Sequence, residues 1–232
     1  MSSVSPTLIA IETSTELASV ALLQRGQVHC RESSGAQMHS LKVPSLLQSL
    51  LADAGLSLSQ CDAVAFGAGP GSFTGVRTAC GLAQGLAFGA QRPVVPVVTL
   101  LAMAERARSQ GAGDEVLAVL DARMGEVYWA QYRFDQGWQA VSEPRLSAAS
   151  AVVAAGSPAL CGNGLLAYAG DLAHLRSSAR MPEVLPHAAE VARLAAVAFA
   201  DGHSVHARDA QPLYLRNKVA LTTQERLAGA SA

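Results

Sequence analysis

The sequence contains few charged residues. Asp, Glu, Lys and Arg make up only 15% of its 232 residues and the net charge is −1, whereas an average soluble protein is about 25% charged. This near-zero charge excludes a broad basic surface for nucleic acid, and an apolar share of 50% excludes an intrinsically disordered chain. A chain of this composition covers much of its surface with small uncharged residues, and such a surface is easily buried against another protein.

Long apolar runs and cysteine pairs are also absent. The longest uncharged run, 146–170, is interrupted by serine, glycine and proline, whereas a membrane-spanning helix needs about 20 mainly apolar residues. The first six residues contain no basic stretch followed by an apolar one, so we expect no secretory signal. None of the four cysteines forms a C-x-x-C pair, which favours reduced thiols. These features predict a cytoplasmic protein that does not contact a membrane.

Apolar periodicity and turn residues predict a regular order of elements in the first half of the chain. Three strands joined by short polar links are followed by a helix that glycine ends, and then by alternating strands and helices. The predicted strands are 7–12, 17–23, 27–33, 63–66 and 94–98, and the predicted helices are 41–54, 73–90 and 100–108. The order is therefore β-β-β-α-β-α-β-α.

The second half repeats this theme more weakly. Residues 109–114 (SQGAGD) are typical of a linker, and strands are predicted over 115–120 and 126–134. Helices are predicted near 148–155 and over 188–200. We therefore expect two lobes, the first over 1–108 and the second, with a tail, over 109–232.

A glycine-rich loop, 67–75 (GAGPGSFTG), joins a predicted strand to a predicted helix. Free N–H groups at a helix N-terminus can hold an anion. The loop lacks the Lys-Ser/Thr pair of a P-loop, the third glycine of a Rossmann fingerprint and the glycines that flank a nucleophilic serine. Two interpretations stay open: a tight turn with Ser72 as the helix N-cap, or direct contact with a ligand.

Two acid-bearing turns occupy matching places in the two halves. Glu12-Thr13-Ser14-Thr15 follows the first strand, and Asp121 opens the corresponding turn of the second half. Such a turn can face a phosphate, and its acid can hold Mg²⁺ through water. The alternative is an ordinary hairpin turn. Together with the glycine loop, these turns give a set of candidate nucleotide-binding residues: Glu12, Thr13, Ser14, Gly69, Gly71, Ser72 and Asp121.

The helix predicted over 73–90 has no polar side, and its only charged residue is Arg77. Three of its glycines, Gly81, Gly85 and Gly89, lie four residues apart. Each costs about 1 kcal/mol of helix stability against alanine, so together they indicate close packing of a second helix. The helix over 41–54 likewise has a nearly chargeless outer face. We predict a docking surface for a partner, the alternative being a layer supplied by the second half of the chain. The predicted contact residues are Leu41, Ser45, Gln48, Ser49, Ala52, Thr78, Gly81, Leu82, Gly85, Phe88 and Gly89.

Five segments together resemble the TsaB (YeaZ) family. They are residues 12–23 (ETSTELASVALL), 39–55 (HSLKVPSLLQSLLADAG), 62–104 (DAVAFGAGPGSFTGVRTACGLAQGLAFGAQRPVVPVVTLLAMA), 121–132 (DARMGEVYWAQY) and 212–220 (PLYLRNKVA). The resemblance implies an α/β protein with the fold of actin, sugar kinases and heat-shock-type ATPases (the ASKHA fold). That fold has two β-β-β-α-β-α lobes, of which the second is here reduced. The element order predicted from the residues agrees with it independently.

The resemblance also implies a function in making threonylcarbamoyladenosine at the tRNA adenosine beside the anticodon. In the relative TsaD, an H-x-E-G-H motif follows the strand that corresponds to 94–98 and holds the catalytic metal. The matching positions here are Thr99, Leu101 and Met103, which are poor or impossible ligands. The resemblance therefore implies a non-catalytic scaffold without a metal site. It implies that the chain pairs with TsaD as a heterodimer through the two chargeless helices, is joined by the ATPase TsaE, forms a homodimer when alone and meets tRNA only indirectly.

A second hypothesis is a self-sufficient ATPase or small-molecule kinase of the same fold, which would use Glu12, Ser14, Ser72 and Asp121 around Mg·ATP. Glu12 stands where this fold commonly has Asp, and its extra methylene displaces the carboxylate. We therefore expect no tightly bound cofactor, with ATP or ADP held only weakly or at the partner interface. A metallopeptidase, the third class, lacks its ligands.

Overall fold

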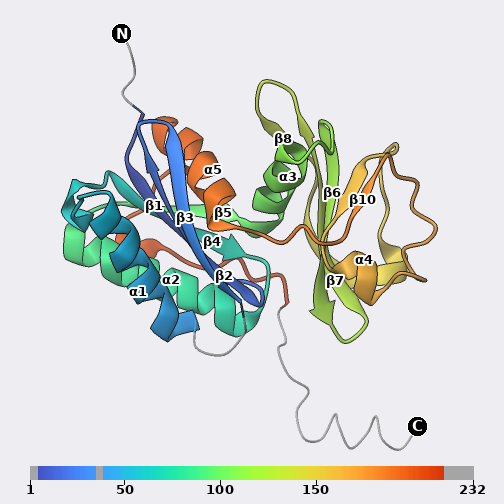
Figure 1. Cartoon of the computed structure of the whole chain (residues 1–232). Coiled ribbons are helices and arrows are strands. Elements are labelled where there is room, and N and C mark those ends of the chain that lie inside the picture. Colours follow the sequence, from blue (N-terminus) through green and yellow to red (C-terminus); the bar gives the residue numbers. More distant parts are fainter. Residues whose placement is uncertain (1–4, 35–38, 217–232) are drawn as a thin grey trace, which may run out of the picture.

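A computed structural model describes residues 5–34 and 39–216, and it forms two lobes, each built on a five-stranded mixed sheet (Figure 1). The first sheet has the order β3-β2-β1-β4-β5 and the second the order β10-β9-β6-β7-β8. The strands of the first sheet are β1 (Leu8–Glu12), β2 (Leu17–Gln24), β3 (Gln27–Ser34), β4 (Ala63–Gly69) and β5 (Val94–Val98). Those of the second are β6 (Glu115–Arg123), β7 (Glu126–Phe134), β8 (Trp138–Ala148), β9 (Ala159–Cys161) and β10 (Arg180–Met181).

Five α-helices and three short 3-10 helices complete the described chain. The α-helices are α1 (His39–Asp53), α2 (Phe73–Ala90), α3 (Thr99–Ser109), α4 (Gly164–Ala167) and α5 (Ala188–Ala200). The 3-10 helices are η1 (Leu58–Gln60), η2 (Ala149–Ala151) and η3 (Ala207–Asp209). The predicted β-β-β-α-β-α-β-α order of the first half is confirmed.

The first sheet is buried on both faces because successive side chains of its central strands point to opposite sides. Ile9 and Ile11 of β1 pack in one core cluster with the inner faces of α1 and α2. Leu8 and Ala10 pack in another cluster with Val191 and neighbouring residues of α5. β1 therefore reads as an apolar run rather than an alternating one.

One helix from each half of the sequence packs on the sheet of the other half. α3 precedes the predicted linker, yet Leu100 and Met103 pack with Val116 and Ala118 on the second sheet. α5 lies in the second half of the sequence, yet it covers the first sheet, and the two helices contact each other between the lobes. The strands of the first sheet precede 109–114 and those of the second follow it, whereas α3 and α5 each pack on the sheet of the other half. Residues 217–232 of the predicted second lobe and tail lie outside the described residues.

The helix predicted near 148–155 is wrong. β8 continues to Ala148 because it pairs with β7 as far as Glu126, and only the short η2 follows. Two adjacent valines, Val152 and Val153, then alternate between buried and exposed in extended chain, where β-branched residues are favourable. β8, β9 and β10 were not predicted, and β4 extends through Gly69, so the first glycines of the loop belong to a strand.

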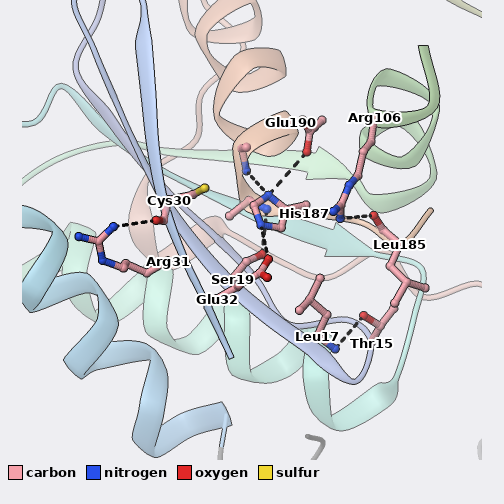
Figure 2. A network of polar contacts seen from close by, with 12 residues as sticks. Thr15, Leu17, Ser19, Cys30, Arg31, Glu32, Arg106, Leu185, His187 and Glu190 are labelled. Carbon is pink, nitrogen blue, oxygen red and sulfur yellow. Dashed lines mark hydrogen bonds and ion pairs between the residues drawn. The ribbon is translucent and has the colours of Figure 1, made fainter. Parts of the chain in front are cut away.

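His187 caps α5 at the point where the chain returns to the first lobe (Figure 2). Its Nδ1 accepts the N–H of Ala189 at 3.1 Å, and its Nε2 lies 3.2 Å from Oε2 of Glu32 on β3. The cap requires an unprotonated Nδ1, so the neutral ring carries its proton on Nε2 and donates it to Glu32. One imidazole therefore fixes both the start of α5 and its distance from the edge strand.

The surroundings of His187 keep the ring neutral. Burial lowers the pKa of His187, and the nearby Arg106 guanidinium of α3 acts in the same direction, while Glu190 and Glu32 oppose them. Arg106 is itself held by a 3.0 Å hydrogen bond to the carbonyl of Leu185, and Ser19 Oγ accepts the N–H that follows the histidine. β2, β3, α3 and α5 thus converge on this residue (Figure 2).

We predict a loss of stability on acidification that depends on His187. Its pKa is lower in the folded chain than in the unfolded chain, so the unfolded chain takes up the proton first as the pH falls. The free energy of unfolding is then undiminished above the ordinary histidine pKa of about 6.5 and falls below it. Urea unfolding at about pH 7.5 and 5.5 should show a flatter pH dependence for His187→Asn, which keeps a good N-cap without titrating.

His203→Asn is the matched control for this prediction because His203 is exposed. It should retain the pH dependence of the wild type. Equal slopes for His187→Asn and the wild type would contradict the prediction.

Candidate functional site

A cleft of about 440 Å³ lies between the two lobes. The turn after β1 and the N-terminal end of α2 line it from the first lobe, the C-terminal end of β6 lines it from the second, and residues 213–216 run along it. The structure brings five of the candidate nucleotide-binding residues to this lining: Thr13, Ser14, Gly71, Ser72 and Asp121.

The turn after β1 and the glycine loop touch backbone to backbone. Ser72 N–H donates to the carbonyl of Ser14 at 2.8 Å, and Thr13 Oγ1 donates to the carbonyl of Gly75 at 2.7 Å. A Cβ on Gly75 would lie 2.0 Å from the Thr13 carbonyl oxygen, and one on Gly71 would lie 2.6 Å from the Ser14 Cβ. Only glycine fits at these two positions, because the turn after β1 and the glycine loop approach each other too closely for a side chain. The contact holds the start of α2 against β1.

Two hydroxyls in this part of the cleft are not used by the fold. Ser72 is the N-cap residue of α2, but its side chain makes no capping hydrogen bond. Ser14 is 1% exposed, and its Oγ has no hydrogen-bond partner among the described residues. Ser72 is therefore the N-cap residue of α2, as the first of the two interpretations has it, although its hydroxyl does not make the capping hydrogen bond.

Glu12 does not reach the cleft, contrary to its place among the candidates. It is 0% exposed, and its Oε1 accepts the Ser14 N–H at 2.6 Å. Its Oε2 has no partner within the described part of the chain and points at β4, where a Cβ on Gly67 would lie only 1.7 Å away. Burial raises the pKa of Glu12, and the hydrogen bond that its carboxylate accepts from the Ser14 N–H opposes this shift only in part. A carboxyl buried in this way cannot hold Mg²⁺ in the cleft.

Gly69 also lies outside the cleft lining. Its φ of +102° favours glycine, its N–H donates to Thr99 Oγ1 at 3.0 Å, and a Cβ there would meet the Leu213 carbonyl oxygen at 3.2 Å. Gly69 is therefore a structural residue at the end of β4.

Asp121 lines the cleft, but the fold already engages its carboxylate. Oδ1 accepts hydrogen bonds from the Arg123 N–H at 2.7 Å and from the Tyr168 hydroxyl at 2.9 Å, and Oδ2 lies 3.1 Å from the Arg123 guanidinium. The sequence analysis missed Arg123, Tyr128 and residues 213–216 as cleft residues. Residues 212–216 (PLYLR) belong to a segment that resembles the TsaB family, but no neighbouring residue indicates which part of the fold they contact.

α1 and α2 cover the face of the first sheet opposite α5, and their outer face is exposed as predicted (Figure 1). Nine of the eleven predicted contact residues are exposed, and Thr78 and Leu82 are half-buried. Leu41 and Phe88 are 66% and 73% exposed. A Cβ added at Gly81, Gly85 or Gly89 would meet nothing within 4 Å. Of the second half of the chain, the described residues up to 216 do not cover this face, contrary to the alternative.

Comparison with known proteins gives one consistent answer. A family model described as "TsaD: tRNA N6-adenosine threonylcarbamoyltransferase" matches residues 29–225. The tRNA threonylcarbamoyladenosine biosynthesis protein TsaB of Haemophilus influenzae is 38% identical, over 92% of this chain and 94% of its own length. TsaB of Escherichia coli is 39% identical, over 92% of this chain and 96% of its own. The chain belongs to the TsaB family.

A solved structure supports this assignment. YeaZ from Pseudomonas aeruginosa is 39% identical and superposes with a TM-score of 0.85, covering 90% of this chain and all of that one. The fold of this TsaB-family chain is the expected ASKHA fold, with two mixed sheets and helices.

Thr99 and Met103, two of the three positions that the resemblance sets against the TsaD metal motif, serve the fold of this chain. Thr99 is buried and accepts the Gly69 N–H, and Met103 is fully buried in the core of the second lobe. Residues 5–34 and 39–216 contain no group of three or more His, Cys, Asp or Glu placed to hold a metal ion. Within the same ranges, no helix is long and apolar enough to cross a membrane.

We predict that Gly67→Ala destabilises the chain and that Glu12→Asp relieves the damage. The added methyl would collide with the Glu12 carboxylate, and overpacking of this kind costs about 1–3 kcal/mol. Asp at position 12 withdraws the carboxylate by one methylene. Urea unfolding of the two single variants and the double variant should therefore show a coupling free energy of about 1 kcal/mol or more in favour of the double variant.

Gly81→Ala is the control, since its Cβ would stand in open space, and it should leave stability unchanged or raise it by up to about 1 kcal/mol. Additive effects of Gly67→Ala and Glu12→Asp would refute the contact.

Proposed function

We propose that this chain is a non-catalytic scaffold subunit in the formation of tRNA threonylcarbamoyladenosine, and that it binds and activates TsaD together with TsaE in the cytoplasm. The observation that carries the proposal is the exposed, chargeless outer face of α1 and α2 on a chain of the TsaB family. The names of its full-length relatives, tRNA threonylcarbamoyladenosine biosynthesis proteins, support the pathway.

The outer face has the properties of a helix-docking surface. Two large apolar side chains, Leu41 of α1 and Phe88 of α2, are mostly exposed to solvent, and three glycines of α2 leave its backbone uncovered. Helix axes pack about 8–10 Å apart, and the shorter distance needs small residues at the contact. The glycines therefore allow a facing helix to approach closely while the large residues fill the margins. A second copy of the chain docks on this face when TsaD is absent.

The residues of the cleft support a scaffold better than a self-sufficient ATPase or kinase. Glu12 is buried inside the first lobe, and the Asp121 carboxylate is engaged by Arg123 and Tyr168. Neither carboxylate is free to bind Mg²⁺ beside a triphosphate. ATP or ADP accordingly binds only weakly or at the partner interface. Because the net charge of the chain is only −1, the other subunits bind the tRNA.

We predict that Gly85→Arg abolishes binding to TsaD and leaves the fold intact. The arginine side chain would intrude on the facing helix and bury an unpaired charge, which costs about 2–5 kcal/mol of association free energy. In the free chain it meets no neighbour, and arginine forms helix better than glycine, so the melting temperature should hold or rise. A pull-down with TsaD and a thermal melt test both statements.

Gly170→Arg is the matched control, because Gly170 is also exposed and open but lies in the second lobe. It should bind TsaD normally. An unfolded Gly85→Arg variant would mean that Gly85 faces the core of its own chain, and binding to TsaD at wild-type strength would place the docking surface elsewhere; either result contradicts the prediction.

We also predict that the purified chain transfers no threonylcarbamoyl group and retains no stoichiometric metal, because Thr99, Leu101 and Met103 stand at the metal-ligand positions. Elemental analysis after dialysis tests the metal, and calorimetric titration with Mg·ATP separates the scaffold from a kinase. Zinc or iron near one per chain, or tight ATP binding by the chain alone, would overturn the proposal.

A further inference from the structure

Residues 210–216, which we call the strap, are held first by the N-terminal lobe. The Ala210 carbonyl accepts the side-chain amide of Gln84 on α2 at 3.0 Å, and the Leu213 N–H donates to the carbonyl of Ala68 on β4 at 2.7 Å. Between these contacts the strap follows α2 toward its N-terminal end. In Figure 1 this red end of the described ribbon lies between the lobes.

The strap then attaches to the second lobe. Leu215 packs against the core cluster that joins α3 to β6 and β7, and Arg216 forms an ion pair with Glu126 at the start of β7. Leu213, Tyr214, Leu215 and Arg216 all line the cleft on the way. Seven residues therefore span the two lobes and form one side of the cleft between them.

The strap also reaches the surface beside the outer face of α2. The Tyr214 hydroxyl accepts a 2.8 Å hydrogen bond from Nε of Arg77, the only charged residue of α2. The Arg77 guanidinium lies 3.5 Å from the ring centroid of Phe73 and 5.5 Å from that of Tyr214. Arg77 directly precedes Thr78, which belongs both to the predicted docking face and to the cleft lining.

We propose that the strap links the position of the second lobe to the outer face of α2. The affinity of α2 for a docked partner then depends on how the second lobe is placed. The Tyr214–Arg77–Phe73 stack is the latch on α2, and the Arg216–Glu126 ion pair is the latch on β7. The partner half of this proposal rests on the proposed function; the latches are properties of the free chain.

Hydrogen exchange in the free chain tests the latches. Glu126→Arg breaks the ion pair, and Glu126→Arg with Arg216→Glu restores it with the signs exchanged. We expect Glu126→Arg to speed exchange of the Leu213 amide about fivefold and the double variant to reverse this. Glu115→Arg is the control, because Glu115 pairs with Arg133 at the opposite end of the same β6–β7 hairpin, at 2.8 Å. Unchanged exchange at Leu213 in Glu126→Arg overturns the proposal.

Two further readouts test the coupling. The Val76 amide closes the first turn of α2 by donating to the Ser72 carbonyl at 2.9 Å, and its exchange should rise in Glu126→Arg and recover in the double variant. The affinity for TsaD should fall and recover in parallel, again about fivefold. If Leu213 exchange rises while Val76 exchange and TsaD affinity keep wild-type values, the strap is not coupled to α2 and the proposal fails. A wild-type chain that does not bind TsaD overturns the proposed function, and Val76 exchange then decides the coupling alone.

Discussion

The contact between the turn after β1 and the start of α2 is the constraint on which the rest of the first lobe depends. Two main-chain segments meet there with no side chain between them, and Gly71 and Gly75 are the residues that make this possible. The contact fixes the start of α2, and the helix then runs across the sheet with Val76, Ala79 and Ala83 inward. Its glycine-bearing face must consequently point outward. One main-chain contact thus sets the cleft on one side and orients the docking helix on the other.

The parts of the fold with a local signal could be predicted from sequence. α2 was predicted with its observed bounds because an apolar face, a preceding serine and a glycine-spaced outer face all agree. The exposure of Gly81, Gly85 and Gly89 followed from the same pattern, since three glycines in one helix require a packing reason. The run at 148–155 carried no such signal, because a sequence of alanine and valine suits a helix and an extended strand alike.

The remaining errors concern long-range placement. Nothing near Glu12 shows whether its side chain turns toward solvent or toward β4, and that choice depends on Gly67, 55 positions later in the sequence. The sequence likewise does not indicate on which sheet α3 and α5 pack, because each helix has an apolar face that fits either sheet. Most of the strap belongs to the 212–220 segment that resembles the TsaB family, but Arg77 and Glu126, which it contacts, are distant from it in sequence.

The exchange of helices also has a consequence for synthesis on the ribosome. The first sheet is complete once β5 has emerged, but the face formed by Leu8, Ala10 and Ala65 stays uncovered until α5 follows about 90 residues later. The strands on which α3 packs, β6, β7 and β9, have all emerged by residue 161, so α3 can be covered before α5 appears. The nascent first lobe therefore keeps one bare apolar sheet face until residues 188–200 arrive, after the strands of the second lobe have been made. A chain cut at the linker would leave each fragment without the helix that covers its sheet.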